Sequence, residues 1–178
     1  MEKQEEIRIR KAKAEDIQGV TEVFYRTWLA TYPNKEAGIT KEDIEYRFKD
    51  AFTKESLAER ARKIVPTCKG EAFLVAEYES KIVGICWVKQ YYDKNELLAI
   101  YVLCGYQGKG VGSSLWKEAQ VYFSPNKKTV VWVAKYNEKT IEFYRGLGFK
   151  ETGREYQKEE HRMKSGAYIT EIEMAILK

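Results

Sequence analysis

The chain has 178 residues, of which 44% are hydrophobic and 33% are charged, as is usual for one folded domain of ordinary size. Its 31 basic and 27 acidic residues are interspersed, and a net charge of +4 is small for a nucleic-acid-binding protein. Three widely spaced cysteines argue against a disulfide framework or a zinc site, and no apolar run is long enough to span a membrane. We therefore expect a single cytoplasmic domain over residues 1–178, with no metal, nucleic-acid or membrane partner.

The N-terminal third of the sequence predicts one strand followed by three helices. Residues 7–12 alternate between apolar and polar side chains, as a half-buried strand does. Apolar residues at helical spacing predict a helix over 15–32, which a proline ends. Two more helices are expected at 40–52, with Thr40 as the N-cap, and at about 54–65.

Strands dominate the rest of the chain. The patterns predict strands at 72–78, 81–88, 96–103, 129–134, 149–157 and 168–176, with a helix after the third of these and another at 138–146. The order is one strand, three helices, three strands, then helix, strand, helix and two strands. Such an order predicts an α/β (α+β) domain with a mixed sheet.

The turn at 107–112, Gln-Gly-Lys-Gly-Val-Gly, joins the strand at 96–103 to a helix. Glycines let backbone N–H groups approach an anion, and the N-terminus of the following helix favours negative charge. A Walker loop needs Ser or Thr after its lysine, but Gly110 follows Lys109; a dinucleotide fingerprint needs a third glycine, but Ser113 stands there. The turn therefore predicts a phosphate-bearing ligand of a different kind.

The spacing Gln-x-x-Gly-x-Gly within this turn resembles the pyrophosphate-binding motif of the GNAT superfamily of acetyl-CoA-dependent N-acetyltransferases. A second segment, 137–149, is similar to the superfamily's next strand-to-helix unit, Asn-x-x-Ala-x-x-Phe-Tyr-x-x-x-Gly-Phe, with Thr140 in place of the alanine. Two motifs in the correct order occur together by chance far less often than one. The resemblance covers 72–177 well and implies a GNAT-like fold, in which six to seven mostly antiparallel strands splay apart at the cofactor cleft.

By this resemblance, acetyl-CoA is the co-substrate and no metal takes part. The implied contacts are backbone groups of Val102 and Leu103 with the pantetheine arm, the loop with the pyrophosphate, and Asn137 with the arm. The loop residues are Gln107, Gly108, Lys109, Gly110, Val111, Gly112 and Ser113. On residue type alone, Lys109 could equally point into water and Asn137 could be only a helix N-cap. A bulge or irregularity near 102–105 is expected to help open the ladder.

Two side chains are candidates for the proton transfers that amine acetylation requires. Tyr144 matches the family position of a phenol that contacts the cofactor and protonates the departing thiolate, and its alternative role is core packing beside Phe143. Glu96 matches a frequent glutamate position and is the candidate base, although a charged residue at a strand edge often only faces solvent. The single histidine, His161, lies in a polar string and is interpreted as a solvated loop residue.

The sequence is least informative about the acceptor. Trp28 and Tyr32 are the candidate substrate-binding residues, because aromatic faces attract cations and this stretch resembles bacterial polyamine acetyltransferases of the superfamily. We expect direct acetyl transfer to a small-molecule primary amine, such as a polyamine or another small cation. The alternatives are a non-catalytic CoA-binding sensor module and a peptide or protein N-acetyltransferase. Exposed strand edges near the C-terminus favour a homodimer.

Overall fold

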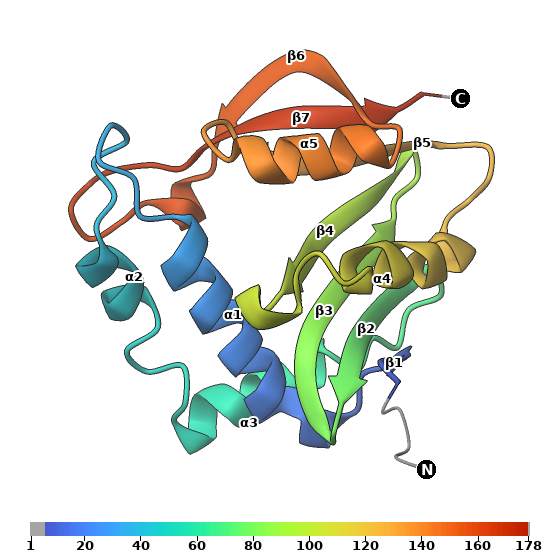
Figure 1. Cartoon of the computed structure of the whole chain (residues 1–178), viewed down its shortest axis with the longest axis horizontal. Helices are drawn as coiled ribbons and strands as arrows, with labels where there is room; N and C mark the ends of the chain where they lie inside the picture. The colour runs from blue at the N-terminus through green and yellow to red at the C-terminus, as the bar shows by residue number, and fades with distance from the viewer. Residues whose placement is uncertain (1–5, 178) are drawn as a thin grey trace.

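The computed structural model describes residues 6–177, which form one seven-stranded sheet with five α-helices around it (Figure 1). The strands are β1 (Arg8–Lys11), β2 (Glu71–Tyr78), β3 (Lys81–Gln90), β4 (Lys94–Val102), β5 (Lys128–Ala134), β6 (Lys150–Gln157) and β7 (Thr170–Ile176). The helices are α1 (Ile17–Thr31), α2 (Lys41–Arg47), α3 (Lys54–Lys63), α4 (Val111–Ala119) and α5 (Glu138–Gly146). The predicted order of elements and the mixed, mostly antiparallel sheet are confirmed.

The sheet is open between its fourth and fifth strands. The strand order is β1-β2-β3-β4-β5-β7-β6, and β4 and β5 are parallel neighbours. They pair only over four residue pairs, from Lys94 with Lys128 to Leu97 with Val131. Beyond that row the strands diverge, so the sheet consists of two halves that meet at one end (Figure 1). The predicted splay is therefore confirmed.

A bulge in β4 lies where the two halves begin to separate. The register of β4 against β3 shifts by one residue, which leaves Leu98 without a partner in β3. At the predicted bulge or irregularity near 102–105, the structure shows no register shift, but just beyond Val102 the chain does leave the ladder, for a 3₁₀ turn at Cys104–Tyr106. The irregularity that opens the sheet thus lies upstream of the glycine loop, beside the last parallel pair of β4 and β5.

The second helix is shorter than predicted. Thr40 caps α2 as expected, since its side chain accepts a hydrogen bond from the Asp43 N–H, but the helix ends at Arg47 instead of residue 52. Thr53 already caps the next helix, α3. The residues between the two helices form turns that redirect the chain toward α1 and α3, and a continuous helix would prevent that change of direction.

Two layers of helices cover the two faces of the sheet. On one face α4 and α5 pack against the largest hydrophobic cluster, in which Leu115 is fully buried. On the other face α1 packs on β3 and β4 and contacts both α2 and α3 (Figure 1). The connection between β6 and β7 is tied to α2, because the Ser165 N–H and hydroxyl each donate to Asp43 at 2.9 Å. This connection and α1 therefore enclose one region beside the open part of the sheet.

Candidate active site

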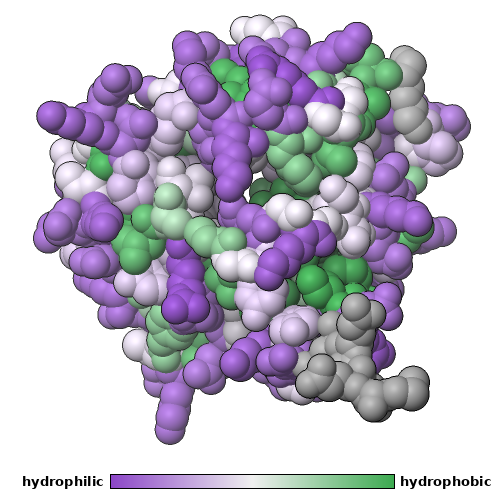
Figure 2. Space-filling view, in the orientation of Figure 1, coloured by the Kyte–Doolittle hydropathy of each residue, from purple (hydrophilic) through white to green (hydrophobic). Residues whose placement is uncertain are grey.

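A cleft of about 560 Å³ lies where β4, the glycine loop and α5 meet. Eight residues predicted from the sequence line it: Val102, Gln107, Gly108, Gly110, Val111, Gly112, Ser113 and Asn137. A smaller cavity of about 90 Å³ shares Val102, Gln107 and Asn137 with it and lies between the diverging strands, where Tyr144 and Tyr32 line it. Figure 2 shows the hollow between α4 and α5, with hydrophobic side chains at its floor.

The glycine loop leaves space in front of its backbone. Gly108 and Gly110 have φ angles of +73° and +79°, a conformation that side chains other than glycine rarely adopt, and Gly110 directly precedes α4. A Cβ atom added to either residue would meet nothing within 4 Å. At Gly112 the same atom would lie 3.2 Å from the ring of Phe143. The first two glycines therefore leave room for a ligand, whereas the third lets α4 and α5 pack closely.

The end of β4 directs backbone groups toward the gap. The Leu103 N–H donates to the Val83 carbonyl at 2.9 Å, so the backbone of Leu103 is directed toward β3. Backbone groups alternate in direction along an antiparallel strand, so those of Ile100 and Val102 are directed away from β3, toward the gap. Leu103 lines neither cavity. Ile100, which the sequence motif does not mark, can be found by counting back two residues from Val102.

Gln107 and Lys139 form a bridge across the mouth of the cleft. The Gln107 side chain donates to the Val102 carbonyl at 2.9 Å and accepts from the Lys139 ammonium at 2.8 Å. Lys109, in contrast, lies over the ring of Tyr106 at 5.4 Å and lines neither cavity. The cation at the cleft is therefore Lys139, which the sequence analysis missed although it lies two residues after Asn137.

The first turn of α5 faces the cleft. Asn137 is the N-cap of this helix, since its side-chain oxygen accepts from the Thr140 N–H at 3.3 Å. Asn137 and Thr140 line both cavities, so the residue that departs from the family's alanine stands in the cleft wall. The N-cap bond uses only the oxygen of the Asn137 amide, and its NH₂ group makes no hydrogen bond to residues 6–177.

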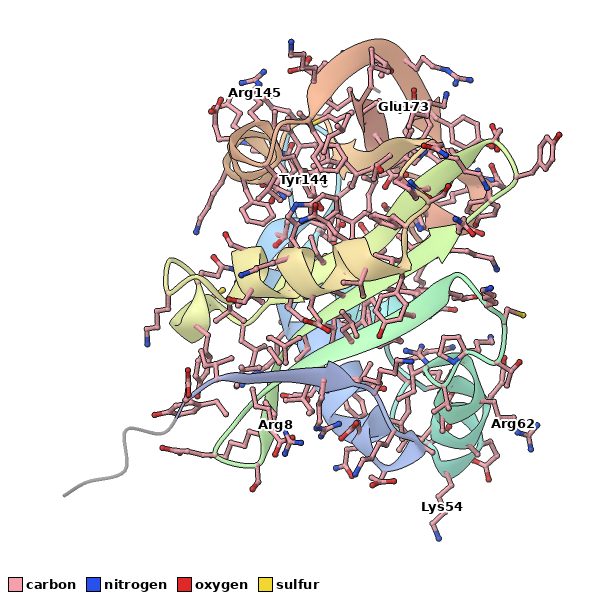
Figure 3. All side chains as sticks on the ribbon, turned by 90° about the vertical axis from the view of Figure 1, so that its right-hand side faces the viewer. Arg8, Lys54, Arg62, Tyr144, Arg145 and Glu173 are labelled. Carbon is pink, nitrogen blue, oxygen red and sulfur yellow. The ribbon has the colours of Figure 1, made fainter. Side chains whose placement is uncertain are left out.

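Tyr144 is directed from α5 into the interior, whereas the adjacent Arg145 is directed outward (Figure 3). Its ring packs against Phe143 and Phe149, and the residue is 4% exposed. Its hydroxyl has no hydrogen-bond partner among the described residues, and the residue lines the cavity between β4 and β5. Burial, with smaller contributions from Tyr101 and Cys86, raises the pKa of Tyr144 well above 10. This phenol therefore keeps its proton at every physiological pH.

Two other predicted residues lie outside both cavities. Glu96 is in the paired part of β4, where its carboxylate contacts the Lys94 ammonium at 2.7 Å. Trp28 is 7% exposed, and the guanidinium of Arg47 lies 4.8 Å from its ring centre, in the position expected for a substrate cation. Tyr32, by contrast, does reach the gap, and its hydroxyl shares a 2.9 Å hydrogen bond with that of Tyr101.

Residues 6–177 contain no group of three or more His, Cys, Asp or Glu side chains arranged to hold a metal ion. Over the same residues, no helix is both long and apolar enough to cross a membrane.

The fold and the site together indicate a transferase that binds a phosphate-bearing donor. The features that indicate it are the open mixed sheet, the glycine loop before a helix and the phenol in the gap. The family model of the acetyltransferase (GNAT) domain matches residues 29–164. A spermidine N(1)-acetyltransferase from Thermoplasma acidophilum is 32% identical over 151 residues, which cover 81% of this chain and 88% of that protein. The chain belongs to the GNAT superfamily and is an acetyl-CoA-dependent N-acetyltransferase.

Solved structures agree with this assignment. The PaiA N-acetyltransferase of Thermoplasma acidophilum, crystallised with coenzyme A, superposes with a TM-score of 0.68 at 27% identity over 93% of this chain and 98% of its own. A GNAT-family acetyltransferase from Streptococcus pneumoniae has a TM-score of 0.70 at 21% identity, over 97% of this chain and 100% of its own. The second likeness supports the fold.

Substitution of Gly110 by alanine is expected to weaken acetyl-CoA binding about tenfold, because the added methyl group enters the open space in front of the loop. Isothermal titration with acetyl-CoA measures the effect. Gly166→Ala is the matched control, since Gly166 has a φ of +90°, has equal space around it and lines neither cavity. Equal affinities in the two variants would contradict the assignment of the loop.

Proposed function

We propose that this acetyltransferase moves the acetyl group directly from acetyl-CoA to the primary amine of a small molecule, and that the amine is a polyamine. The observation that carries the direct transfer is the hydroxyl of the buried Tyr144, which has no hydrogen-bond partner among residues 6–177, in the gap between β4 and β5. The polyamine rests on the spermidine N(1)-acetyltransferase that is 32% identical to this chain.

The donor half of the site fits acetyl-CoA. The loop glycines and the N-terminus of α4 offer backbone N–H groups to the pyrophosphate, with the Lys139 ammonium nearby. The free edge of Ile100 and Val102 can pair with the amide groups of the pantetheine arm as a neighbouring strand would. In that arrangement the Gln107 amide releases the Val102 carbonyl, to which it now donates. Acetyl-CoA supplies an activated thioester to this gap.

The residues of the gap then act on the leaving group. A neutral amine attacks the thioester carbonyl, the C–N bond forms, and the C–S bond breaks as the tetrahedral species collapses. The Tyr144 hydroxyl donates its proton to the departing sulfur and recovers one from the nitrogen, which carries a surplus proton after the attack. Because its pKa lies well above 10, Tyr144 enters each cycle protonated. No covalent bond to the protein is needed.

The alternative of a non-catalytic sensor is less well supported, because a sensor needs no proton donor beside the thioester. The alternative of a peptide or protein acceptor, and the predicted homodimer, rest on no structural observation. The outer edge strand β6 is exposed along its length and carries Lys150, Glu151, Arg154 and Glu155. Charged side chains on an edge strand oppose pairing with a second copy, so we do not place a dimer interface on this strand.

The proposal is tested by thiol release from acetyl-CoA with a panel of acceptors: polyamines, monoamines, amino acids, aminoglycosides and peptide N-termini. We expect release with polyamines and at least tenfold lower kcat/KM with peptides. Mass spectrometry of the product should show one added acetyl group on the amine. Binding of acetyl-CoA without release for any acceptor would favour the sensor, and a preference for peptides would overturn the polyamine assignment.

A further inference from the structure

A buried carboxylate and an imidazole lie together on the acceptor side of the sheet. Glu171 of β7 is 6% exposed, and its Oε2 atom is 3.7 Å from Nδ1 of His161 and 3.3 Å from the Lys158 ammonium. Both Oε2 and Nδ1 are buried atoms that form no hydrogen bond with any described residue. Oε2 is ion-paired with Lys158 and lies beside the imidazole, but neither contact has the geometry of a hydrogen bond. Buried polar atoms are usually hydrogen-bonded, so these two atoms have hydrogen-bonding capacity that the described residues do not use.

The pair lies close to the gap that Tyr144 lines. Glu171 is paired with Ala134 of β5, and Ala134 lines the cavity between β4 and β5 together with Tyr32 and Tyr144. Burial raises the pKa of Tyr32 well above 10, and the charges of Tyr101, Glu171 and Tyr144 raise it further. Glu171 and Tyr144 therefore both contribute to the electrostatic environment of Tyr32.

The surroundings of the pair favour a carboxylate that stays ionised. Burial alone would raise the pKa of Glu171, but His161 and Lys158 outweigh it and hold that pKa below its ordinary value. The charged and titratable groups around the pair come from four elements: Tyr32 of α1, Arg47 of α2, Tyr101 of β4, and Lys158 and Glu160 of the β6–β7 connection. Trp28 covers the imidazole, with the two ring centres 5.7 Å apart.

Glu96, the carboxylate matched by sequence, differs from Glu171 in its strand partner. Each glutamate contacts a lysine, and neither lines a cavity itself. Val130, which is paired with Glu96, also lines neither cavity, whereas Ala134, which is paired with Glu171, lines the gap cavity. An alkyl ammonium must lose a proton before its nitrogen can attack, so a proton acceptor is required on the acceptor side. Glu171 is the buried carboxylate that the fold places beside the gap cavity, opposite a strand residue that lines it.

We propose, on the basis of the proposed amine acetylation, that Glu171 removes the proton of the acceptor ammonium and that His161 positions Glu171 and passes this proton on to solvent. An N–H bond of the ammonium breaks, an O–H bond forms on Oε2, and the nitrogen keeps the electron pair that attacks the thioester. The proton then moves to Nδ1 of His161, whose Nε2 lies on the side of the exposed Glu160. One proton leaves per turnover, as the conversion of an ammonium and a thioester into an amide and a thiol requires.

Two amines separate this role from a structural one. The first is the best alkyl amine of the acceptor panel, protonated at the assay pH because its pKa is about 10. The second is its β,β-difluoro analogue, whose lower ammonium pKa leaves most of it neutral at the assay pH, so that it need not lose a proton before it attacks. We expect Glu171→Gln to lower kcat about 100-fold with the alkyl amine and less than about threefold with the analogue. His161→Asn should show the same contrast with a smaller loss.

Glu173→Gln is the matched control. Glu173 lies two residues from Glu171 on the same face of β7, is 4% exposed, and accepts from the Thr152 hydroxyl at 2.9 Å, outside both cavities. It should leave kcat unchanged with both amines, and titration should show unchanged acetyl-CoA binding in all three variants.

Several outcomes would overturn the inference while the wild-type chain is active. The first is an equal loss of kcat with both amines. The second is an increase of the acceptor KM at constant kcat, which would make Glu171 only a cation-binding group. The third is full activity of both variants. If the wild-type chain itself releases no thiol with any amine, the proposed function fails and the inference fails with it.

Discussion

Replacing Tyr144 with phenylalanine is expected to lower kcat by about 100-fold or more while the dissociation constant of acetyl-CoA stays nearly unchanged. The substitution keeps the ring that packs against Phe143 and Phe149 and removes only the hydroxyl. That hydroxyl makes no hydrogen bond to the described residues, so its loss leaves no protein group unpaired. The departing thiolate, however, loses its proton donor. Steady-state kinetics and titration with acetyl-CoA measure the two quantities separately.

Tyr156→Phe is a suitable control, because Tyr156 is 55% exposed on β6 and lines neither cavity. It should match the wild-type protein in both measurements. A Tyr144→Phe variant that loses turnover and cofactor affinity to the same extent would show that the hydroxyl serves binding instead of proton donation. Unchanged turnover would remove Tyr144 from the reaction.

Substitution of Leu115 by alanine is expected to lower the free energy of unfolding by about 3 kcal/mol. Leu115 is fully buried in α4, and a Cβ atom on Gly84 of β3 would already lie 3.2 Å from its Cδ1 atom. The helix therefore rests directly on the strand, and truncation leaves a cavity that rigid β3 cannot fill. Urea unfolding should show the loss, and the melting temperature should fall by roughly 6–12 °C.

Val121→Ala serves as the comparison for this substitution. Val121 follows α4 by two residues and is 70% exposed, so its truncation should change the free energy of unfolding by less than about 0.5 kcal/mol. If the two variants were equally stable, the packing of α4 on β3 would contribute little, and the orientation of the glycine loop would need another support.

The parts of the fold that the sequence predicts best are those fixed by neighbouring residues. Glycine spacing, a proline stop and helix caps act within a few positions, so the turn at 107–112 and the N-caps Thr40 and Asn137 could be found from the sequence. The length of α2 depended on where the chain had to turn toward α3. The bulge depended on the register of β4 against β3, which no local pattern encodes.

The candidate site divides in the same way. The loop and Tyr144 belong to local motifs; in the structure the loop lines the larger cleft and Tyr144 lines the adjoining cavity between β4 and β5. Whether Glu96 meets a substrate or the ammonium of Lys94 depends on side-chain placement across strands, as does the direction of Lys109. The surroundings of the Glu171 carboxylate are formed by His161, ten positions earlier, and by Trp28 of α1, which packs against the imidazole from the other end of the chain. The alternation of polar and apolar residues along β7 does not indicate that the side chain of Glu171 is buried.

The four pairs that join β4 to β5 have a further consequence for the stability of this protein. The two half-sheets are joined over a short row, so acetyl-CoA bound in the proposed way would take the place of a missing strand and complete the hydrogen bonding of the sheet interior. Its binding free energy is added to the stability of the folded chain. The free concentration of acetyl-CoA relative to its dissociation constant therefore sets how much this ligand stabilises the folded acetyltransferase.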